Sequence, residues 1–376
     1  MSTTHVIDRT THIGRTDHFA SRRQAGRREA WDGRFVPAGD VYKLGRRPLL
    51  DGVRGLAVTM VVLSHCCVPL MVGAGMVGVT LFFVLSGFLI TRLLLEEHAR
   101  TGGINLRAFY LRRARRLVPA LLLFLAVASM ALARQGISPG EVITSLTYTS
   151  NLFRWTGINA KFLTHTWSLS MEEQFYLLWP FALVLLLRRR IAVLGGSLGV
   201  VAVAVAANRL WLSGHVADIQ RVYLAPDVRA DAIIVGCLLA VFIDRLSAMR
   251  WRVMAPIAAA AMVLCFPASE SQLVVLLLPA TLACAVVIMW AATSAASGWV
   301  RSCLWVRLGR ISYGVYLWHM PIALPMLYRQ VPWWVVTAVT VPASLVIASL
   351  SWRFLEAPIL GAEWPRPTVS EATRTP

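Results

Sequence analysis

The chain has 376 residues, of which 57% are hydrophobic and 15% are charged. An average soluble domain is roughly 45–50% apolar and about 25% charged, so the composition argues against a single soluble domain. The formal net charge is +18. Such a charge can indicate nucleic-acid binding, but here the arginines lie at the ends of apolar runs, as they do in the loops of membrane proteins. The six cysteines show no paired spacing, which argues against a disulfide scaffold.

The first 47 residues are polar and lack the apolar region and cleavage site of a signal peptide. We interpret residues 1–47 as a disordered basic cytoplasmic tail that can touch anionic lipid. We expect a membrane domain over residues 48–356 and a cytoplasmic C-terminal tail over residues 357–376.

Apolar runs follow the tail, and each is about long enough to cross a ~30 Å hydrocarbon core. They predict an all-α fold, a polytopic integral membrane helical bundle with about ten transmembrane helices. The expected ranges are 50–70, 76–95, 117–133, 173–187, 191–207, 230–243, 253–268, 273–293, 311–328 and 333–352.

The loops between these ranges predict the orientation of the chain. With a cytoplasmic N-terminus, the inner loops hold about twice as many arginines and lysines as the outer loops, which favours an N-in and C-in arrangement. The inner loops then include an arginine cluster at 112–116 and a second run at 188–190. We find no internal repeat beyond helical hairpins, so repetition does not support a transporter built from two halves.

The first apolar run contains the ionisable residues Arg54 and His65, whose burial in a membrane is energetically unfavourable. A central arginine in a membrane helix costs about 2.5–3.5 kcal/mol, so such residues are candidates for function. Eleven residues separate the two, which places them within about 20° on one helical face and about 16 Å apart along it. We expect both to line one polar cavity. The alternatives are that His65 only packs between helices and that Arg54 only reaches toward the membrane surface, paired with Asp51.

Several short motifs recur in a fixed order along the chain. They are Arg54-x10-His65, Phe82–Phe88, Phe109–Arg116, Trp167–Tyr176, Arg229-x-Asp231 with Gly236, Gly309–Pro321 and Glu356-Ala357-Pro358. In order and spacing these motifs resemble the bacterial integral-membrane acyltransferase family 3, from residue 49 to about residue 360.

The resemblance implies a ten-helix membrane domain that moves an acyl group, usually acetyl, from cytoplasmic acyl-CoA to a hydroxyl on a glycan or small molecule. Such a transfer needs a base to take the hydroxyl proton, and an imidazole suits that role. In the family the histidine of the Arg-x10-His motif is this base, which falls on His65, with Arg54 as its catalytic neighbour. The reaction needs no metal, and the chain has no Cys/His spacing typical of a metal site.

Coenzyme A carries phosphates, and the densest arginine cluster lies on the predicted cytoplasmic side. Arginine binds phosphate in a bidentate manner that lysine does not match. Arg113 and Arg116 match the family pattern, and we predict them, together with Arg112 and Ser86, as cofactor-binding residues. Arg54 is expected to hold phosphate or to orient the thioester. The alternative is that the cluster only anchors the topology.

Glu172 and Glu173 lie on the predicted outer side, at the mouth of the fourth helix. We predict that they bind the hydroxyls of the acceptor or hold His65 in one tautomer. Glu172 is the position that matches the family and is predicted as catalytic, with Glu173 as the second candidate. The alternative is that both complement the dipole at the N-terminus of the helix.

Five further residues are candidates for the acceptor side or the cavity. They are Trp167, Arg229, Asp231, Tyr313 and His319. Asp231 is expected to pair with Arg229 or another buried arginine in a structural role. His319 is either a second titrating group or a packing residue. Trp167 either stacks on a sugar or belongs to an interfacial belt.

The chain ends about twenty residues after the last expected helix, without an esterase-like domain. We therefore expect the membrane domain itself, or a separate partner protein, to bind the acceptor. Cell-envelope glycans and antibiotic sugars are the acceptors that the resemblance implies, at the plasma membrane of a bacterium and without nucleic acid. A transporter or lipid-linked-sugar flippase and a purely structural subunit remain alternative functions.

Overall fold

The computed structural model describes residues 44–45, 47–153, 161–187, 191–216, 219–295 and 303–361. Every regular element in these ranges is helical. The elements are α2 (Pro48–His65), α3 (Val72–Thr101), α4 (Leu106–Leu132), η1 (Ala133–Gln135), α5 (Pro139–Leu146), α6 (Ser150–Phe153), α7 (Thr166–Leu186), α8 (Ile191–His215), α9 (Ile219–Leu224), α10 (Pro226–Leu246), α11 (Trp251–Leu264), α12 (Glu270–Thr293), α14 (Leu304–Tyr328), α15 (Trp333–Ser351), η2 (Trp352–Glu356) and α16 (Ala357–Leu360). The N-terminal tail expected over residues 1–47 lies almost wholly outside the described residues.

Each of the ten helical ranges expected from the apolar runs falls on one of the longer helices, but three helices, α4, α7 and α14, begin seven or more residues earlier than expected. Helix α4 begins at Leu106 rather than at residue 117, because its first turns are rich in arginine, a good helix former that hydropathy does not register. The side chain of Asn105 caps this start by accepting a hydrogen bond of 2.9 Å from the amide of Ala108. The arginine cluster is therefore helical and does not form a loop.

Helix α7 also begins earlier than expected, at Thr166 rather than at residue 173. The chain before it folds into the short helices α5 and α6. Glu141 of α5 is buried, and its Oε2 accepts hydrogen bonds from the backbone amides of Phe162 and Leu163, at 2.7 and 2.9 Å. This carboxylate ties α5 to the residues just before α7. Because α7 begins at Thr166, Glu172 and Glu173 lie about two turns inside a helix.

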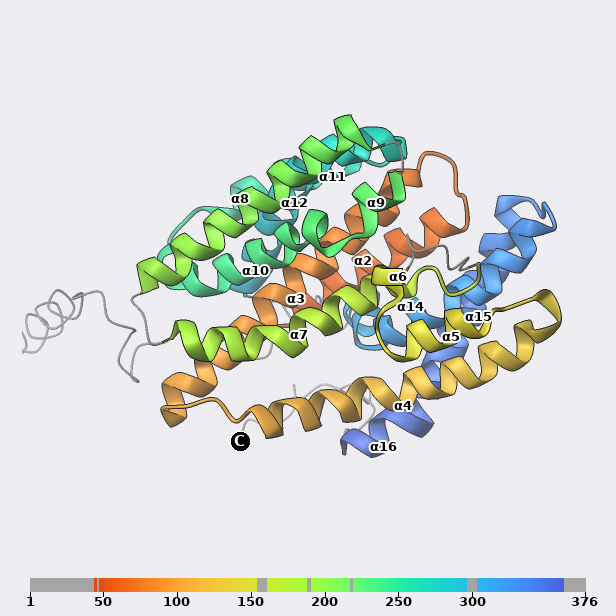
Figure 1. Cartoon of the computed structure of the whole chain (residues 1–376), viewed down its shortest axis with the longest axis horizontal. Coiled ribbons are helices and arrows are strands. Elements are labelled where there is room, and N and C mark those ends of the chain that lie inside the picture. Colours follow the sequence, from red (N-terminus) through yellow and green to blue (C-terminus); the bar gives the residue numbers. More distant parts are fainter. Residues whose placement is uncertain are drawn as a thin grey trace, which may run out of the picture.

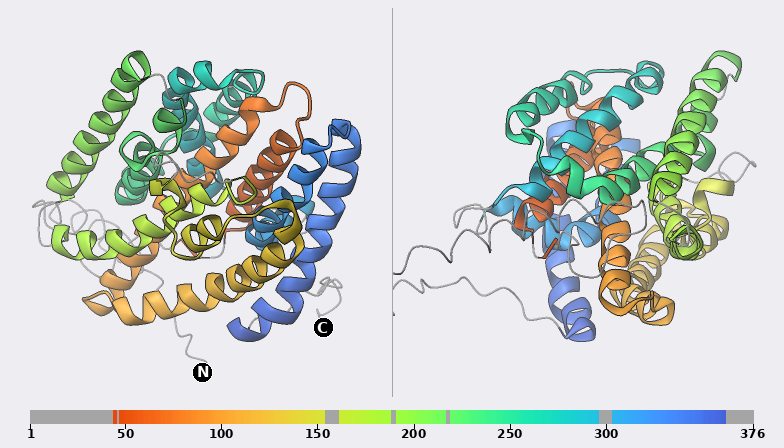
Figure 2. Two further views of the ribbon diagram at one scale, coloured as in Figure 1. Left: turned by 45° about the vertical axis from the view of Figure 1, so that its right-hand side comes forward. Right: turned by 90° about the vertical axis from the view of Figure 1, so that its left-hand side faces the viewer.

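Helices α2, α3 and α14 form the centre of the bundle (Figure 1). Helix α2 packs against both α3 and α14, and α3 in turn packs against α10 and α12. Helices α4, α8 and α15 lie on the outside in the turned views (Figure 2). The residues of interest for function come mainly from the central helices and from the faces of α4 and α7 that point toward them.

Two pairs of glycines bring the central helices into backbone contact. A Cβ atom on Gly55 of α2 would overlap the carbonyl oxygen of Trp305 in α14, and a Cβ on Gly309 of α14 would overlap the carbonyl of Asp51 in α2. Gly87 of α3 and Gly236 of α10 form a second pair of this kind. Small residues at helix crossings allow the close packing on which association inside a membrane depends.

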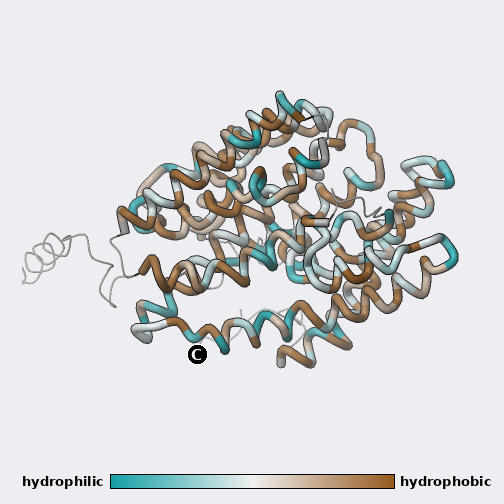
Figure 3. Tube along the Cα trace, viewed as in Figure 1, coloured by the Kyte–Doolittle hydropathy of each residue, from teal (hydrophilic) through white to brown (hydrophobic). Residues whose placement is uncertain are grey.

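Among the described residues, five helices are long and apolar enough to cross a membrane, judged by length and composition. They are Val72–Thr101, Leu106–Gln135, Ala192–His215, Val274–Thr293 and Trp333–Leu360. Apolar residues cover long stretches of the outer helices (Figure 3), and large side chains such as Met130, Val200 and Leu264 are exposed there. Such an apolar exterior suits contact with lipid and is typical of a multi-pass membrane protein.

The glycine contact between α2 and α14 leads to a first prediction. Gly55→Ala should lower the free energy of unfolding by about 1–3 kcal/mol, because the added methyl group pushes two backbones apart. Gly52→Ala in the same helix is the matched control, since its Cβ would meet only a side-chain atom of Val306 at 3.7 Å. Thermal unfolding in detergent measures both, and equal stability of the two variants would contradict the close-contact argument.

Candidate functional site

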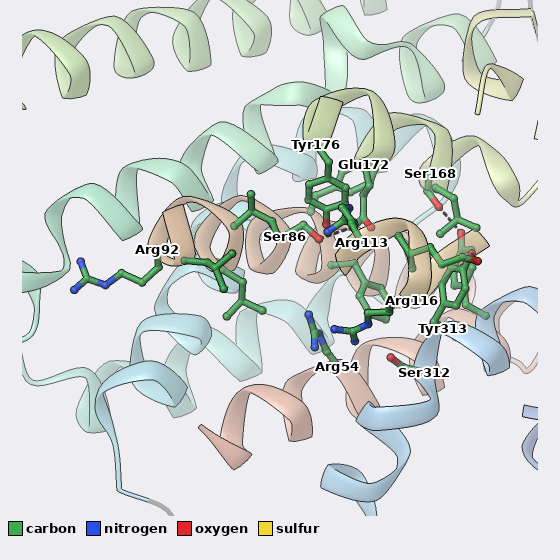
Figure 4. Close-up of a pocket in the computed structure, with 18 of the residues that line it drawn as sticks. Arg54, Ser86, Arg92, Arg113, Arg116, Ser168, Glu172, Tyr176, Ser312 and Tyr313 are labelled. Atoms are coloured by element: carbon green, nitrogen blue, oxygen red, sulfur yellow. Dashed lines mark hydrogen bonds between the residues drawn. The ribbon is translucent and has the colours of Figure 1, made fainter. Parts of the chain in front are cut away.

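A cavity of about 440 Å³ lies between α2, α3, α4, α7 and α14 (Figure 4). Its charged lining consists of four arginines and two glutamates. These are Arg54, Arg92, Arg113, Arg116, Glu96 and Glu172. The side chains of Ser86, Ser168, Tyr176, Ser312, Tyr313 and Tyr316 supply further polar groups. Apolar residues of α3 complete the wall. The cavity therefore combines an apolar surface with a few polar groups, as small-molecule binding sites do.

Helix α7 is joined to α4 and α3 by two charged contacts at this cavity. The guanidinium of Arg113 donates to Glu173 at 2.9 Å and lies over the ring of Tyr176, 3.1 Å from its centroid. Ser86 donates to Oε1 of Glu172 at 2.8 Å. These contacts fix the orientation of Arg113 and Glu172 before any ligand enters.

The contact between Arg113 and Glu173 corrects one prediction. The sequence placed the arginine cluster and the glutamates on opposite sides of the membrane, but the structure joins them in an ion pair at one cavity. The physical reason is that α4 and α7 both start earlier than their apolar runs, so the charged residues of both helices lie within the bundle. Glu173 is therefore held by Arg113, whereas Glu172 faces the cavity.

Two arginines of the cavity remain weakly held. Arg116 has no hydrogen bond or ion pair with any residue that the structure describes, and Arg54 approaches Asp51 only at 3.9 Å. Both guanidinium groups point into the same part of the cavity (Figure 4). Two like charges that share a cavity repel each other, so an anion between them is favoured. Arg112, by contrast, pairs with Glu97 at 3.6 Å and does not line the cavity.

Three imidazoles cluster at the other end of α2. Nδ1 of His65 lies 2.9 Å from Nε2 of His319, and the ring centroid of His165 lies 5.3 Å from that of His319. His65 is not among the residues that line the cavity, although Arg54 is, so the structure does not bring these two to one cavity surface as expected. His319 is fully buried, and His65 is partly exposed.

Tyr316 separates the cavity from the imidazole cluster. Its side chain lines the cavity and shares a hydrogen bond of 2.5 Å with Ser168, and its hydroxyl donates to the carbonyl of His165 at 3.0 Å. On the other side its ring contacts the rings of His165 and His319 at centroid distances of 5.7 and 5.5 Å. We call Tyr316 and Ser168 the partition.

The remaining predicted residues lie in the interior. Trp167 is buried between Phe83 and Tyr223, so its ring does not line the cavity. Asp231 pairs with Arg209 at 2.8 Å, which is one of the kinds of partner expected for it.

Arg229 and Tyr313 complete the predicted set. Arg229 is fully buried and contacts Met76 and Thr80 of α3. Tyr313 lines the cavity, and its hydroxyl donates to the carbonyl of Leu117 at 3.3 Å.

Several residues of the site were not predicted from the sequence. Arg92 was hidden within a long apolar run, although a charge in such a run was itself a signal. Tyr176, Ser168 and Tyr316 belonged to quoted motifs but received no role, and His165 lay in an expected loop. Within the described ranges, no group of three His, Cys, Asp or Glu residues is arranged to hold a metal ion.

Most of the chain matches known proteins. Residues 47–353 match the acyltransferase family 3 model, described as an acyltransferase domain. The chain is 34% identical over 351 residues to the peptidoglycan O-acetyltransferase OatA of Listeria monocytogenes, which covers 83% of this chain and 55% of that protein. The putative peptidoglycan O-acetyltransferase YrhL of Bacillus subtilis is also 34% identical, over 83% of this chain and 54% of its own length.

A third relative, the O-acetyltransferase OatA of Staphylococcus aureus, is 29% identical over 83% of this chain and 57% of its own length. The chain thus spans about half the length of these relatives. No solved structure matches. Because the family model covers most of the chain, including every helix that lines the cavity, the chain belongs to acyltransferase family 3.

Proposed function

We propose that the chain is a membrane O-acyltransferase that moves an acyl group, acetyl in the first instance, from acyl-CoA to a hydroxyl of a cell-envelope glycan or a sugar-containing small molecule. The observation that carries the proposal is the cavity itself. It offers two weakly held arginines at one end and ends at the partition, directly beside the imidazole cluster. The relatives in Listeria monocytogenes and Bacillus subtilis are named as a peptidoglycan O-acetyltransferase and a putative one, which supports a glycan acceptor.

The arginines suit the phosphates of coenzyme A. Arg54 is held only by its long contact with Asp51, so it and Arg116 can turn toward an anion. Arg113 is fixed by Glu173 and acts through its positive charge rather than as a mobile hydrogen-bond donor. Arg54 and His65 are about 16 Å apart along α2. An extended pantetheine arm is of similar length, so a donor whose phosphates bind at Arg54 directs its thioester toward the imidazole cluster.

The chemistry needs one base. The oxygen of the acceptor hydroxyl attacks the thioester carbonyl, the carbon–sulfur bond breaks, and the coenzyme leaves as a thiol. His65 takes the proton of the hydroxyl and returns it to the sulfur, which keeps the charge balanced through the step. Ser86 and Glu172 line the path of the arm. For the two substrates to meet, the hydrogen bond between Tyr316 and Ser168 has to open.

The direct test is transfer of label. Purified protein in detergent, given radiolabelled acetyl-CoA and candidate acceptors, should acetylate one of them, and His65→Ala should lower the rate by at least about 10²-fold because the general base is lost. Size-exclusion chromatography and acetyl-CoA binding control for folding. Label transfer at the wild-type rate in His65→Ala would refute the base, whereas movement of an acceptor without acetylation would indicate a transporter.

The role of Arg116 gives a separate prediction. Arg116→Ala should raise the KM for acetyl-CoA by on the order of 10-fold, since a charge-assisted hydrogen bond is worth about 1.5–3 kcal/mol. The KM for the acceptor should change little. Arg112→Ala in the same helix is the matched control, because Arg112 pairs with Glu97 outside the cavity. Steady-state kinetics measures both variants, and a change confined to the acceptor KM would place the acceptor, not the donor, at Arg116.

The N-in and C-in orientation, which puts the donor in the cytoplasm, is tested by labelling. In a background with Cys67 and Cys303 replaced by serine, we expect Gly103→Cys to be shielded in intact bacterial cells and Arg329→Cys to react with an impermeant maleimide. Both positions are exposed turns next to helix ends. Labelling of both after permeabilisation is the control. The reverse pattern would move the donor site to the outer face.

A further inference from the structure

His319 has a defined proton position. Its Nδ1 lies 2.7 Å from the carbonyl oxygen of Tyr316 and 3.3 Å from that of Val315. A carbonyl oxygen only accepts hydrogen bonds, so Nδ1 of His319 carries a proton and donates it. No carboxylate forms a hydrogen bond or ion pair with His65, His165 or His319 in the part of the chain that the structure describes. A second proton on His319 would leave a buried imidazolium without a counter-charge, so the ring is neutral and its Nε2 is an acceptor.

The tautomer of His65 follows from that of His319. Nδ1 of His65 lies 2.9 Å from this acceptor nitrogen, so Nδ1 of His65 must donate. The planes of the two rings differ by 15°. The ring centroids are 5.1 Å apart, and this distance exceeds the 2.9 Å between the two nitrogens by about two ring radii. The rings therefore meet edge to edge and nearly in one plane, the arrangement in which an imidazole N–H points along the lone pair of another.

On the function proposed above, we infer that His319 is a positioning residue that holds His65 in its Nδ1–H tautomer and so leaves Nε2 of His65 free to accept the proton of the acceptor hydroxyl. The chain of donors runs from His65 to His319 to the backbone of α14, without a carboxylate. It does the orienting work that an aspartate does in a Ser-His-Asp triad, but with a neutral partner that can be buried in a membrane bundle at lower cost.

The surroundings of His319 support this assignment. The ring is fully buried and is enclosed by Tyr316 from its own helix and by His165 from the segment before α7. His165 does not compete for Nε2 of His319, because its own Nε2 donates to the carbonyl of Leu317 at 3.2 Å and its Nδ1 has no hydrogen-bond partner among the described residues. The group within hydrogen-bond reach of Nε2 of His319 is thus the ring of His65.

Two substitutions separate positioning from packing. The amide of glutamine lies near the Nε2 position of histidine and can accept from His65, whereas the amide of asparagine reaches only the Nδ1 position and can donate to Tyr316. We expect His319→Asn to lower kcat by on the order of 10²-fold with an unchanged KM for acetyl-CoA, and His319→Gln to retain kcat within about 10-fold of the wild type. In the His65→Ala background, His319→Asn should cause no further loss, because its effect passes through His65.

Nitrogen-15 NMR of histidine-labelled protein in lipid nanodiscs reads the tautomer without reference to activity. We expect His65 as the Nδ1–H form in the wild type and in His319→Gln, and a shift toward the Nε2–H form in His319→Asn. An Nε2–H His65 in the wild type, or undiminished kcat in His319→Asn, would overturn the inference. So would an added loss in the His65→Ala background. If the tautomer is as expected but no acceptor is acetylated, the proposed function fails and the hydrogen-bond assignment stands.

Discussion

The crossing of α2 and α14 is the constraint on which the site depends. Gly55 and Gly309 have no side chains, and each faces a backbone carbonyl of the other helix. Only this close approach brings His319 of α14 within hydrogen-bond distance of His65 in α2. It also lets Tyr313 and Tyr316 line the same cavity as Arg54. One contact between two helices therefore sets the geometry at both ends of the site.

The charges around the cavity are organised by contacts between helices. Burying a charge without a partner is expensive, and Arg113 meets that cost with Glu173 from α7 and the ring of Tyr176. Glu172 is held by Ser86 of α3. What remains is a positive region around Arg54 and Arg116, and two like charges that share a cavity favour an anion between them. The proposal of a phosphorylated donor rests on this property.

The helices could be predicted from the sequence because apolar length is a local property, but contacts across the bundle could not. Hydropathy located α4 and α7 and missed their first turns, which are polar and helical. Residue type singled out Arg54, Arg113, Glu173 and His319. Arg113 and its partner Glu173 are 60 positions apart in the sequence, and His65 and His319 are 254 positions apart. No pattern within one sequence records such pairs.

The motif glycines illustrate the same limit. Gly55, Gly87, Gly236 and Gly309 all fall within the stretches that carried the resemblance, and the structure gives them a packing role. From the sequence alone, a residue that performs chemistry and one that lets two backbones meet look alike.

The partition has a consequence for the bilayer itself. A polar cavity on one side of a membrane protein and a partly exposed imidazole beyond it would together form a path for protons, and every turnover would then leak part of the ion gradient that powers the cell. The ring of Tyr316 lies between the cavity and the imidazoles, with Ser168 hydrogen-bonded to its hydroxyl. The closed partition therefore keeps two polar regions of the bundle apart, so the polar interior is not one continuous passage in this state.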